Sequence, residues 1–451
     1  MYHAVMDRPP PRAYLTARCR DDRLAEQPPP GTLAPGHGRT AVTVLPDHAF
    51  QTILGFGGSF TEAAAVTWAR LDPDARHAFL IDYFDPVRGH GYALGRVHMG
   101  SCDFALGNYS HVEEVGDLAL RSFSIERDRG ALIPFIRAAA AVRGAPLRLL
   151  ASPWSPPGWM KTTGAMNRGG RLLPDCRSAW ARCYVRFIQA YAAAGIPIWA
   201  VSVQNEPEAT QSWDSCLYTG EEERDFVRDH LGPELQRAGL GDVRIIIWDH
   251  NRDRMVERAA LVYSDPAAAR YVWGTGYHWY GADHFDHVQM VHDAWPDKHL
   301  LFTEGCQEGG PHHGSWDLGE RYARSMINDL NRWTEGWIDW NLTLDERGGP
   351  NHVGNYCSAP VLVDTANGTL LHQSSYYYIG HISRFVRPGA RRVLCATADG
   401  DVETAAFLNP DDSVAVVVLN RTESEKALAL RLHERDFAIN LPPRSIATYA
   451  L

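Results

Sequence analysis

Between residues 50 and 342 of this 451-residue chain, short β-rich runs alternate with stretches of helical periodicity. Segments such as residues 179–194 and 321–333 place apolar side chains on one helical stripe. The runs expected to form strands are residues 53–57, 92–98, 147–151, 198–203, 243–248, 271–278, 299–303 and 337–342. Parallel strands need a crossover between them, usually a helix. The alternation therefore predicts an α/β fold, a (β/α)8 TIM barrel whose working residues follow the C-terminal ends of its strands.

The pattern changes after about residue 365. All 14 tryptophans lie between Trp68 and Trp340. The C-terminal part instead has short apolar runs with turn residues between them, at residues 404–408, 413–419, 426–432 and 445–449. Such spacing is typical of an all-β sandwich, which we expect as a side domain.

The N-terminal segment is rich in proline but contains two further strand-like runs, at residues 13–17 and 41–45. We expect residues 1–45 to contribute strands to the sandwich. Residues 46–364 would then form the catalytic barrel, and residues 365–451 the rest of the sandwich.

Charge and composition exclude several partners. The net charge is -10 and no basic stripe is present, which argues against nucleic acid and anionic membranes. No run reaches the roughly 20 apolar residues of an integral membrane segment. The first ten residues hold no apolar core of a signal peptide, so we expect a cytoplasmic protein, with secretion by another route left open. No feature of the sequence indicates an oligomeric state.

Metal and cofactor motifs are also missing from the sequence. The eight cysteines show neither CxxC nor CxxxC spacing, which argues against a zinc site or a disulfide framework. The pairs His312–His313 and His284/His287 have no strong carboxylate–histidine set beside them and are interpreted as solvated side chains. We therefore expect no metal and no cofactor.

Two of the predicted strands end in a glutamate. Glu206 follows the fourth run and Glu304 follows the seventh, about 100 residues later. One βα unit takes roughly 31 residues, so the two acids lie about three units apart, across the barrel mouth. Either glutamate alone could be a helix-start or salt-bridge residue. Together they indicate cleavage of a glycosidic bond, which needs one carboxyl as acid and another as nucleophile or base.

Other strand ends offer groups that suit a sugar. Arg96 and Asp103 follow the second strand, Trp154 follows the third, and Trp340 lies in the eighth. The sequence His278-Trp279-Tyr280 ends the sixth. Indole rings stack on the CH faces of pyranose rings, while polar groups bind the hydroxyls.

Two hypotheses from other classes remain beside the glycosidase. The first is a carbohydrate-binding barrel without catalytic activity, which would have no use for two opposed acids. The second is a Schiff-base lyase, for which Lys161 is the only well-placed member of three lysines.

Taken together, the motifs resemble the glucosylceramidase branch of glycoside hydrolase family 30, from about Gln51 to the C-terminus. The motifs that carry the resemblance are Gly55-Phe-Gly-Gly-Ser-Phe-Thr-Glu62, Arg96-Val-His-Met-Gly-Ser-Cys-Asp103, Ala151-Ser-Pro-Trp154, Gln204-Asn205-Glu206-Pro207, His278-Trp279-Tyr280, Glu304-Gly-Cys306 and Gly336-Trp-Ile-Asp-Trp340.

The resemblance implies a retaining enzyme that cleaves a terminal β-glucosyl residue from glucosylceramide or another β-glucoside by double displacement. Glu206 would be the acid/base and Glu304 the nucleophile, with carboxyl groups about 5 Å apart. We expect burial and the charge of Glu304 to raise the pKa of Glu206. The residues implied to hold or surround the sugar are Asp103, Trp154, Asn205, Trp340, Asn355, Arg96, Tyr280 and Cys306.

The partner would be a small-molecule or oligosaccharide β-glycoside. His98 stands where the lysosomal relatives typically have proline, and His352 where they have an aromatic residue; the loop at residues 208–216 is short. These differences leave the aglycone open, so β-1,6-glucanase and β-xylosidase activity of the same family remain as alternatives.

Overall fold

A computed structural model describes residues 10–451. Its contacts divide the chain into two compact units. Among the described residues, the first comprises residues 10–55, 314–331 and 373–451, and the second comprises residues 56–313 and 332–372. Within residues 10–451, no helix is both long and apolar enough to span a bilayer.

The second unit is a closed barrel, which confirms the predicted (β/α)8 fold. Neighbouring strands pair in parallel, as β4 does with β5 and β9 with β10. In chain order the strands are β4 (Gly55–Phe60), β5 (Leu94–Met99), β6 (Arg148–Pro153), β7 (Ile198–Ser202), β8 (Arg244–Asn251), β9 (Val272–His278), β10 (His299–Glu304) and β11 (Thr334–Asn341).

Barrel strands are covered on both faces, which is why they form nearly continuous apolar runs in the sequence. Every residue of β4 and β5 is buried. Close packing also explains a glycine of the first motif. A Cβ atom at Gly57 would lie 2.0 Å from the carbonyl oxygen of Leu94 on the neighbouring strand, so no larger residue fits there.

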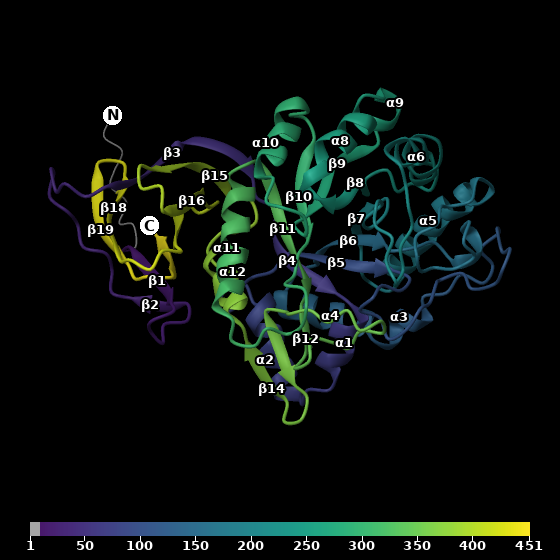
Figure 1. The fold of residues 1–451 in the computed structure, drawn as a ribbon, viewed down its shortest axis with the longest axis horizontal. Helices are drawn as coiled ribbons and strands as arrows, with labels where there is room; N and C mark the ends of the chain where they lie inside the picture. The colour runs from purple at the N-terminus through teal and green to yellow at the C-terminus, as the bar shows by residue number, and fades with distance from the viewer. Residues whose placement is uncertain (1–9) are drawn as a thin grey trace. The chain divides into compact units, whose positions relative to one another are not determined.

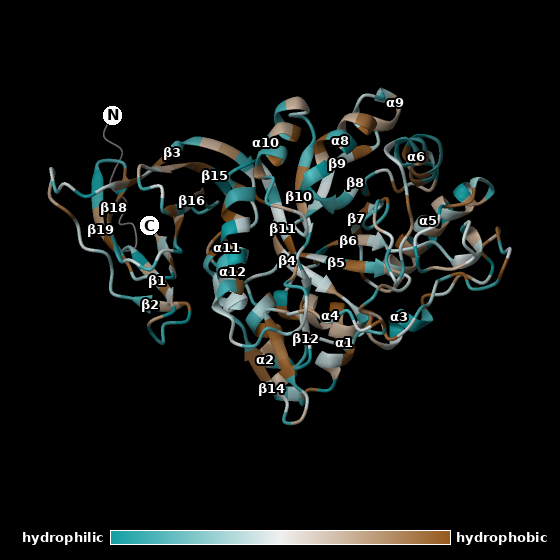
Figure 2. Ribbon diagram, in the orientation of Figure 1, coloured by the Kyte–Doolittle hydropathy of each residue, from teal (hydrophilic) through white to brown (hydrophobic). Residues whose placement is uncertain are grey.

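Helices surround these strands (Figure 1). Figure 2 shows hydrophobic residues along α2, whose Phe79, Leu80, Tyr83 and Phe84 are buried. The helices of this unit are α1 (Glu62–Ala69), α2 (Pro73–Phe84), α3 (Glu126–Gly130), α4 (Leu132–Arg143), α5 (Arg177–Ala193), α6 (Gly220–Phe226), α7 (Gly232–Arg237), α8 (Met255–Tyr263), α9 (Pro266–Ala269) and α10 (Phe285–Ala294). A small sheet of β12 (Thr343–Asp345), β13 (Val361–Asp364) and β14 (Thr369–His372) follows the barrel.

The first unit contains a nine-stranded sheet with the order β19-β18-β3-β15-β16-β17-β20-β1-β2 among the described residues. The strands are β1 (Arg12–Ala17), β2 (Ala25–Gln27), β3 (Ala41–Thr52), β15 (Arg391–Thr397), β16 (Val402–Leu408), β17 (Val414–Asn420), β18 (Lys426–Leu432), β19 (Arg435–Leu441) and β20 (Ser445–Ala450). Leu15 of β1 and Phe437 of β19 belong to one apolar core although they lie near opposite edges, so the sheet folds over on itself as a sandwich does.

Both ends of the chain build this sheet. The N-terminal strand β1 pairs with the C-terminal strand β20, and β3 pairs with β15 and β18. Three strands of this sheet, β2, β15 and β19, were not expected from the sequence. Strand β2 has only three residues, and β15 and β19 begin with arginine and mix polar with apolar residues, which weakens the strand pattern.

The helices α11 (Trp316–Leu330) and α12 (Ser374–Ser383) also belong to the first unit. The sequence places the helical stripe of α11 at residues 321–333, so the helix begins and ends earlier than expected.

Candidate active site

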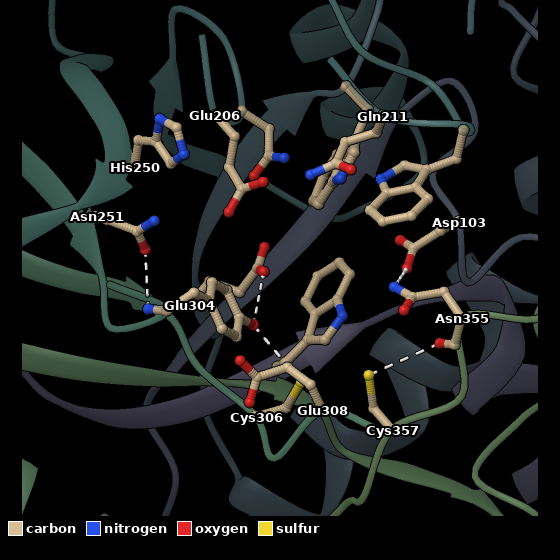
Figure 3. Close-up of a pocket in the computed structure, with 15 residues that line it drawn as sticks. Asp103, Glu206, Gln211, His250, Asn251, Glu304, Cys306, Glu308, Asn355 and Cys357 are labelled. Carbon is tan, nitrogen blue, oxygen red and sulfur yellow. Dashed lines mark hydrogen bonds between the residues drawn. The ribbon is translucent and has the colours of Figure 1, made fainter. Parts of the chain in front are cut away.

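The C-terminal ends of the barrel strands surround a pocket of about 250 Å³ (Figure 3). The predicted site residues all line it except Arg96, which is buried against Glu304. The lining residues are Asp103, Trp154, Asn205, Glu206, Gln211, Trp213, His250, Asn251, Tyr280, Glu304, Cys306, Glu308, Trp340, Asn355 and Cys357.

The two glutamates face each other in this pocket (Figure 3). Glu304 ends β10, while Glu206 follows β7 with a positive φ of 45°. The Glu206 N–H donates to the carbonyl oxygen of Asp249 at 2.9 Å, which holds this uncommon backbone conformation. One carboxylate oxygen of each glutamate and a ring nitrogen of His278 lie within 4.8 Å of one another. Retaining glycosidases have carboxyl groups about 5–5.5 Å apart, whereas inverting enzymes need about 6.5–9.5 Å.

Arg96 connects the nucleophile candidate to a buried polar network. Its guanidinium contacts Glu304 and donates to Asn205 Oδ1 at 2.8 Å and to Asp249 Oδ2 at 2.8 Å. Ser202 Oγ also donates to Asp249 Oδ2, at 2.6 Å. The charges of Arg96 and His278 outweigh the effect of burial and hold the pKa of Asp249 well below its usual range.

His278 lies between the acids. Nδ1 is 3.1 Å from Glu206 Oε1 and Nε2 is 3.0 Å from Asp249 Oδ1. Burial alone would lower the pKa of His278, but the charge of Glu304 and the hydrogen bonds to Asp249 and Glu206 raise it to about 9. The ring is therefore an imidazolium at neutral pH and donates through both nitrogens.

This imidazolium changes the expected acidity of Glu206. Burial acts to raise its pKa, but the hydrogen bond from His278 and the charges of His250, His278 and Arg96 lower it below the ordinary value. The expectation of a raised pKa for Glu206 was therefore wrong. Burial and the charge of Glu206 raise the pKa of Glu304, and they outweigh the positive charges of His278 and Arg96, which lower it.

Aromatic rings form one wall of the pocket. Trp154 and Trp340 stack with centroids 5.1 Å apart, and the guanidinium carbon of Arg96 lies 4.7 Å from the Trp154 ring centroid. The Tyr280 hydroxyl donates to Glu304 Oε1 at 2.9 Å and lies 3.5 Å from Cys306 Sγ. Because the Asn205 oxygen accepts from Arg96, its amide nitrogen is the donor that remains for a substrate hydroxyl.

Asp103 lies at the end of the pocket beside Asn355. Its Oδ2 accepts from Asn355 Nδ2 at 2.9 Å and from Asn351 Nδ2 at 3.3 Å. Burial raises the pKa of Asp103 to about 7, helped by the charge of Glu304 and opposed by the two amide hydrogen bonds.

Several residues of the site were missed by the sequence argument. Asp249, His250 and Asn251 end β8, directly after the apolar residues of this strand. The rule that located Glu206 and Glu304, a polar residue at the end of an apolar run, would have found them too. Asn351 and Cys357 belong to a long loop and carry no comparable signal.

Lys161 does not line the pocket. Its Nζ is buried and donates to the carbonyl oxygens of Met166 at 2.8 Å and Ser215 at 2.6 Å. This amine therefore has a structural role, and the Schiff-base hypothesis loses its only candidate.

Two groups of side chains within residues 10–451 have spacings that could suit a cation. In the first, Glu206, His278 and Glu304, both ring nitrogens of the histidine are already engaged, so the group forms a hydrogen-bonded acid–base set. The second, His284, Asp286 and His287, lies near the start of α10, with His284 and Asp286 exposed.

Paired carboxylates at strand ends four and seven of a (β/α)8 barrel, with stacked indoles beside them, define a glycoside hydrolase. Comparison with known proteins agrees. Residues 53–386 match the glycosyl hydrolase family 30 TIM-barrel domain, and residues 389–449 match the glycosyl hydrolase family 30 beta sandwich domain. The chain belongs to glycosyl hydrolase family 30, as the sequence motifs indicated.

Individual relatives align over nearly the whole chain. The lysosomal acid glucosylceramidase of Mus musculus is 37% identical over 427 residues, which cover 90% of this chain and 82% of the relative. The crystal structure of SrfJ from Salmonella typhimurium is 40% identical, with a TM-score of 0.94 and coverage of 98% and 99% of the two chains. The structure of an endo-beta1,6-glucanase is 31% identical, with a TM-score of 0.89 and the same coverage.

Proposed function

We propose that this enzyme hydrolyses β-glucosidic bonds with retention of configuration, with Glu304 as nucleophile and Glu206 as acid/base. The spacing of the two carboxyl groups, within 4.8 Å, is the observation that carries the proposal. It allows direct attack on the anomeric carbon and leaves no room for the water that an inverting enzyme places between nucleophile and sugar.

In the first step, an oxygen of ionised Glu304 forms a bond to the anomeric carbon while the bond to the aglycone oxygen breaks. Glu206 gives its proton to that leaving oxygen. In the second step, Glu206 takes a proton from water, and the resulting hydroxyl attacks the anomeric carbon. The bond to Glu304 breaks, and the sugar leaves with its original configuration.

The reaction needs the proton on Glu206 while Glu304 is ionised. The two carboxyls are close enough that ionisation of one disfavours ionisation of the other, so they titrate as a pair. Arg96 and Tyr280 both donate to Glu304, and a carboxylate accepts such bonds better than a neutral carboxyl. These contacts favour ionisation of Glu304 and act against burial and the charge of Glu206, which raise its pKa.

Support for a glucosyl substrate comes from the sugar-binding groups and the relatives. Asp103, Trp154, Asn205 and Trp340 form a set suited to a glucose-type ring, and a named relative is a glucosylceramidase. A β-1,6-linked glucan is the second candidate, because the chain is 31% identical to an endo-beta1,6-glucanase over 98% of its length.

Hydrolysis of an aryl β-glucoside tests the reaction and the roles. NMR of the first product should show the β-anomer. With azide present, Glu304→Ala should give the α-glucosyl azide, because azide then attacks from the face of the missing nucleophile. Glu206→Ala should give the β-glucosyl azide and lose roughly 10²–10⁴-fold in rate with a poor leaving group.

The matched control is Glu434→Ala, since this exposed glutamate lies in the first unit, outside the pocket. Its rate should equal that of the unmodified enzyme. Release of the α-anomer, or normal hydrolysis by Glu304→Ala, would contradict the proposed mechanism.

A further inference from the structure

A loop covers the end of the pocket that lies away from the catalytic pair. We call residues 350–357 the capping loop; they lie between β12 and β13. We propose that His352 holds the capping loop closed against Asp103, and that this closure restricts the enzyme to terminal glycosyl residues. The inference rests on the proposed function and adds a residue that determines specificity.

His352 makes the contacts that hold the loop. Its N–H lies 3.3 Å from the carbonyl oxygen of Asp103. The ring Nδ1 lies 3.0 Å from that oxygen and 3.0 Å from the carbonyl oxygen of Ala105. The other ring nitrogen, Nε2, is buried without a hydrogen-bond partner within the described residues. Because both of its partners are carbonyl oxygens, Nδ1 is the donor, and its hydrogen bonds go to the backbone next to the pocket.

The capping loop is rigid in itself. Asn351 Oδ1 accepts from the N–H groups of Val353 at 3.1 Å and Asn355 at 3.0 Å, and Asn351 Nδ2 donates to the Asn355 carbonyl oxygen at 3.1 Å. These bonds fix both amides that hold the Asp103 carboxylate.

The far end of the loop is attached to a different segment. Cys357 forms a β-bridge with Glu308, and the next N–H, that of Ser358, donates to the Gln307 carbonyl oxygen at 2.8 Å. The capping loop thus joins the segment after β5 to the segment after β10. On the β5 side the His352 imidazole binds two backbone carbonyl oxygens, beside the Asn351 and Asn355 amides that bind the Asp103 carboxylate. Loss of the imidazole therefore loosens that edge of the loop and leaves the other in place.

The position of the capping loop and the size of the pocket connect this closure to the choice of substrate. Asp103 and Asn355 lie on one side of Glu206 and Glu304, while His250 and Asn251 lie on the other (Figure 3). The pocket volume of about 250 Å³ is below the roughly 300–1,000 Å³ of sites for drug-sized ligands, which suits one sugar ring. With the anomeric carbon between the glutamates, a further residue attached at the Asp103 end would meet the capping loop.

Two aryl substrates test the inference, the β-glucoside and the β-gentiobioside, with products separated by chromatography. The unmodified enzyme should release aryl alcohol from the glucoside and no disaccharide from the gentiobioside. His352→Ala should release gentiobiose at a rate at least tenfold above the detection limit of the assay. His352→Gln retains a side-chain N–H donor and should therefore release no gentiobiose, like the unmodified enzyme. If His352 only filled space, this donor would make no difference.

His77→Ala is the matched control, because this histidine is exposed on α2 and outside the pocket. If circular dichroism shows that His352→Ala does not fold, His352→Phe keeps the ring volume without the N–H donor and should show the same gain.

The outcomes separate the two proposals. Disaccharide release by the unmodified enzyme, or none by a folded His352→Ala or His352→Phe variant that still cleaves the glucoside, would overturn the role of the capping loop alone. Failure of the unmodified enzyme to cleave any aryl β-glycoside would overturn the proposed function and this inference with it.

Discussion

Asp103→Asn should stabilise the enzyme above pH 7 while it weakens catalysis. Asp103 is 3% exposed, and burial raises its pKa to about 7 from an ordinary value of 3.8. The folded protein therefore binds this proton more tightly than the unfolded chain does. Stability is therefore lost as pH rises from about 4 to about 7. Above pH 7 Asp103 is ionised, and the full cost of burying its charge is present.

The two pKa values of Asp103 set the size of the effect. The pKa of Asp103 is about three units higher in the folded protein than in the unfolded chain, which corresponds to about 4 kcal/mol of unfolding free energy. Asparagine removes this penalty, and its oxygen can still accept from Asn355 and Asn351. The variant should match the unmodified enzyme near pH 4, where Asp103 is neutral, and should exceed it by up to about 4 kcal/mol at pH 8.

Denaturant unfolding followed by tryptophan fluorescence measures this difference. All 14 tryptophans lie between Trp68 and Trp340, so the signal reports mainly the barrel unit. Activity should change in the opposite direction. Loss of a hydrogen bond from a sugar hydroxyl to a carboxylate, worth about 1.5–3 kcal/mol, should lower kcat/KM roughly 10- to 150-fold. A stability difference that stays constant from pH 4 to pH 8 would refute the electrostatic argument.

Two further substitutions test the surroundings of the pocket. In His278→Gln, loss of the imidazolium removes a charge that lowers the pKa of both Glu206 and Glu304, so both limbs of the kcat/KM profile should move to higher pH. An unmoved profile would show that His278 does not set their acidity. Lys161→Met leaves the buried carbonyl oxygen of Ser215 without its side-chain donor, while that of Met166 still accepts from the Ser215 N–H, so the variant should lose about 1–3 kcal/mol in denaturant unfolding. Unchanged stability would contradict the structural role given to this amine.

Local patterns in the sequence located most of the barrel. Its strands and helices repeat an apolar period that can be recognised without knowledge of any distant contact. Strands β15 and β19 were missed because the sheet partners that stabilise them come from other parts of the chain, and their own residues mix polar with apolar.

Some residues of the active site could likewise be found from the sequence, and others could not. Glu206 and Glu304 were found because a carboxylate at the end of an apolar strand has no packing reason to be there. Asp249 also ends a strand, so the same rule would have located it, but that rule does not give its role. Its importance depends on Arg96, Ser202 and His278, which reach it from three other strands.

Short-range periodicity and residue chemistry predict the alternation of elements, the two acids at strand ends and the aromatic and amide groups of a sugar site. The spacing of the acids, the imidazolium that lowers the pKa of Glu206 and the contact of His352 with the backbone near Asp103 arise only in the folded barrel. Those properties depend on distances of a few ångströms between residues up to about 250 positions apart, and the closure of the barrel sets those distances.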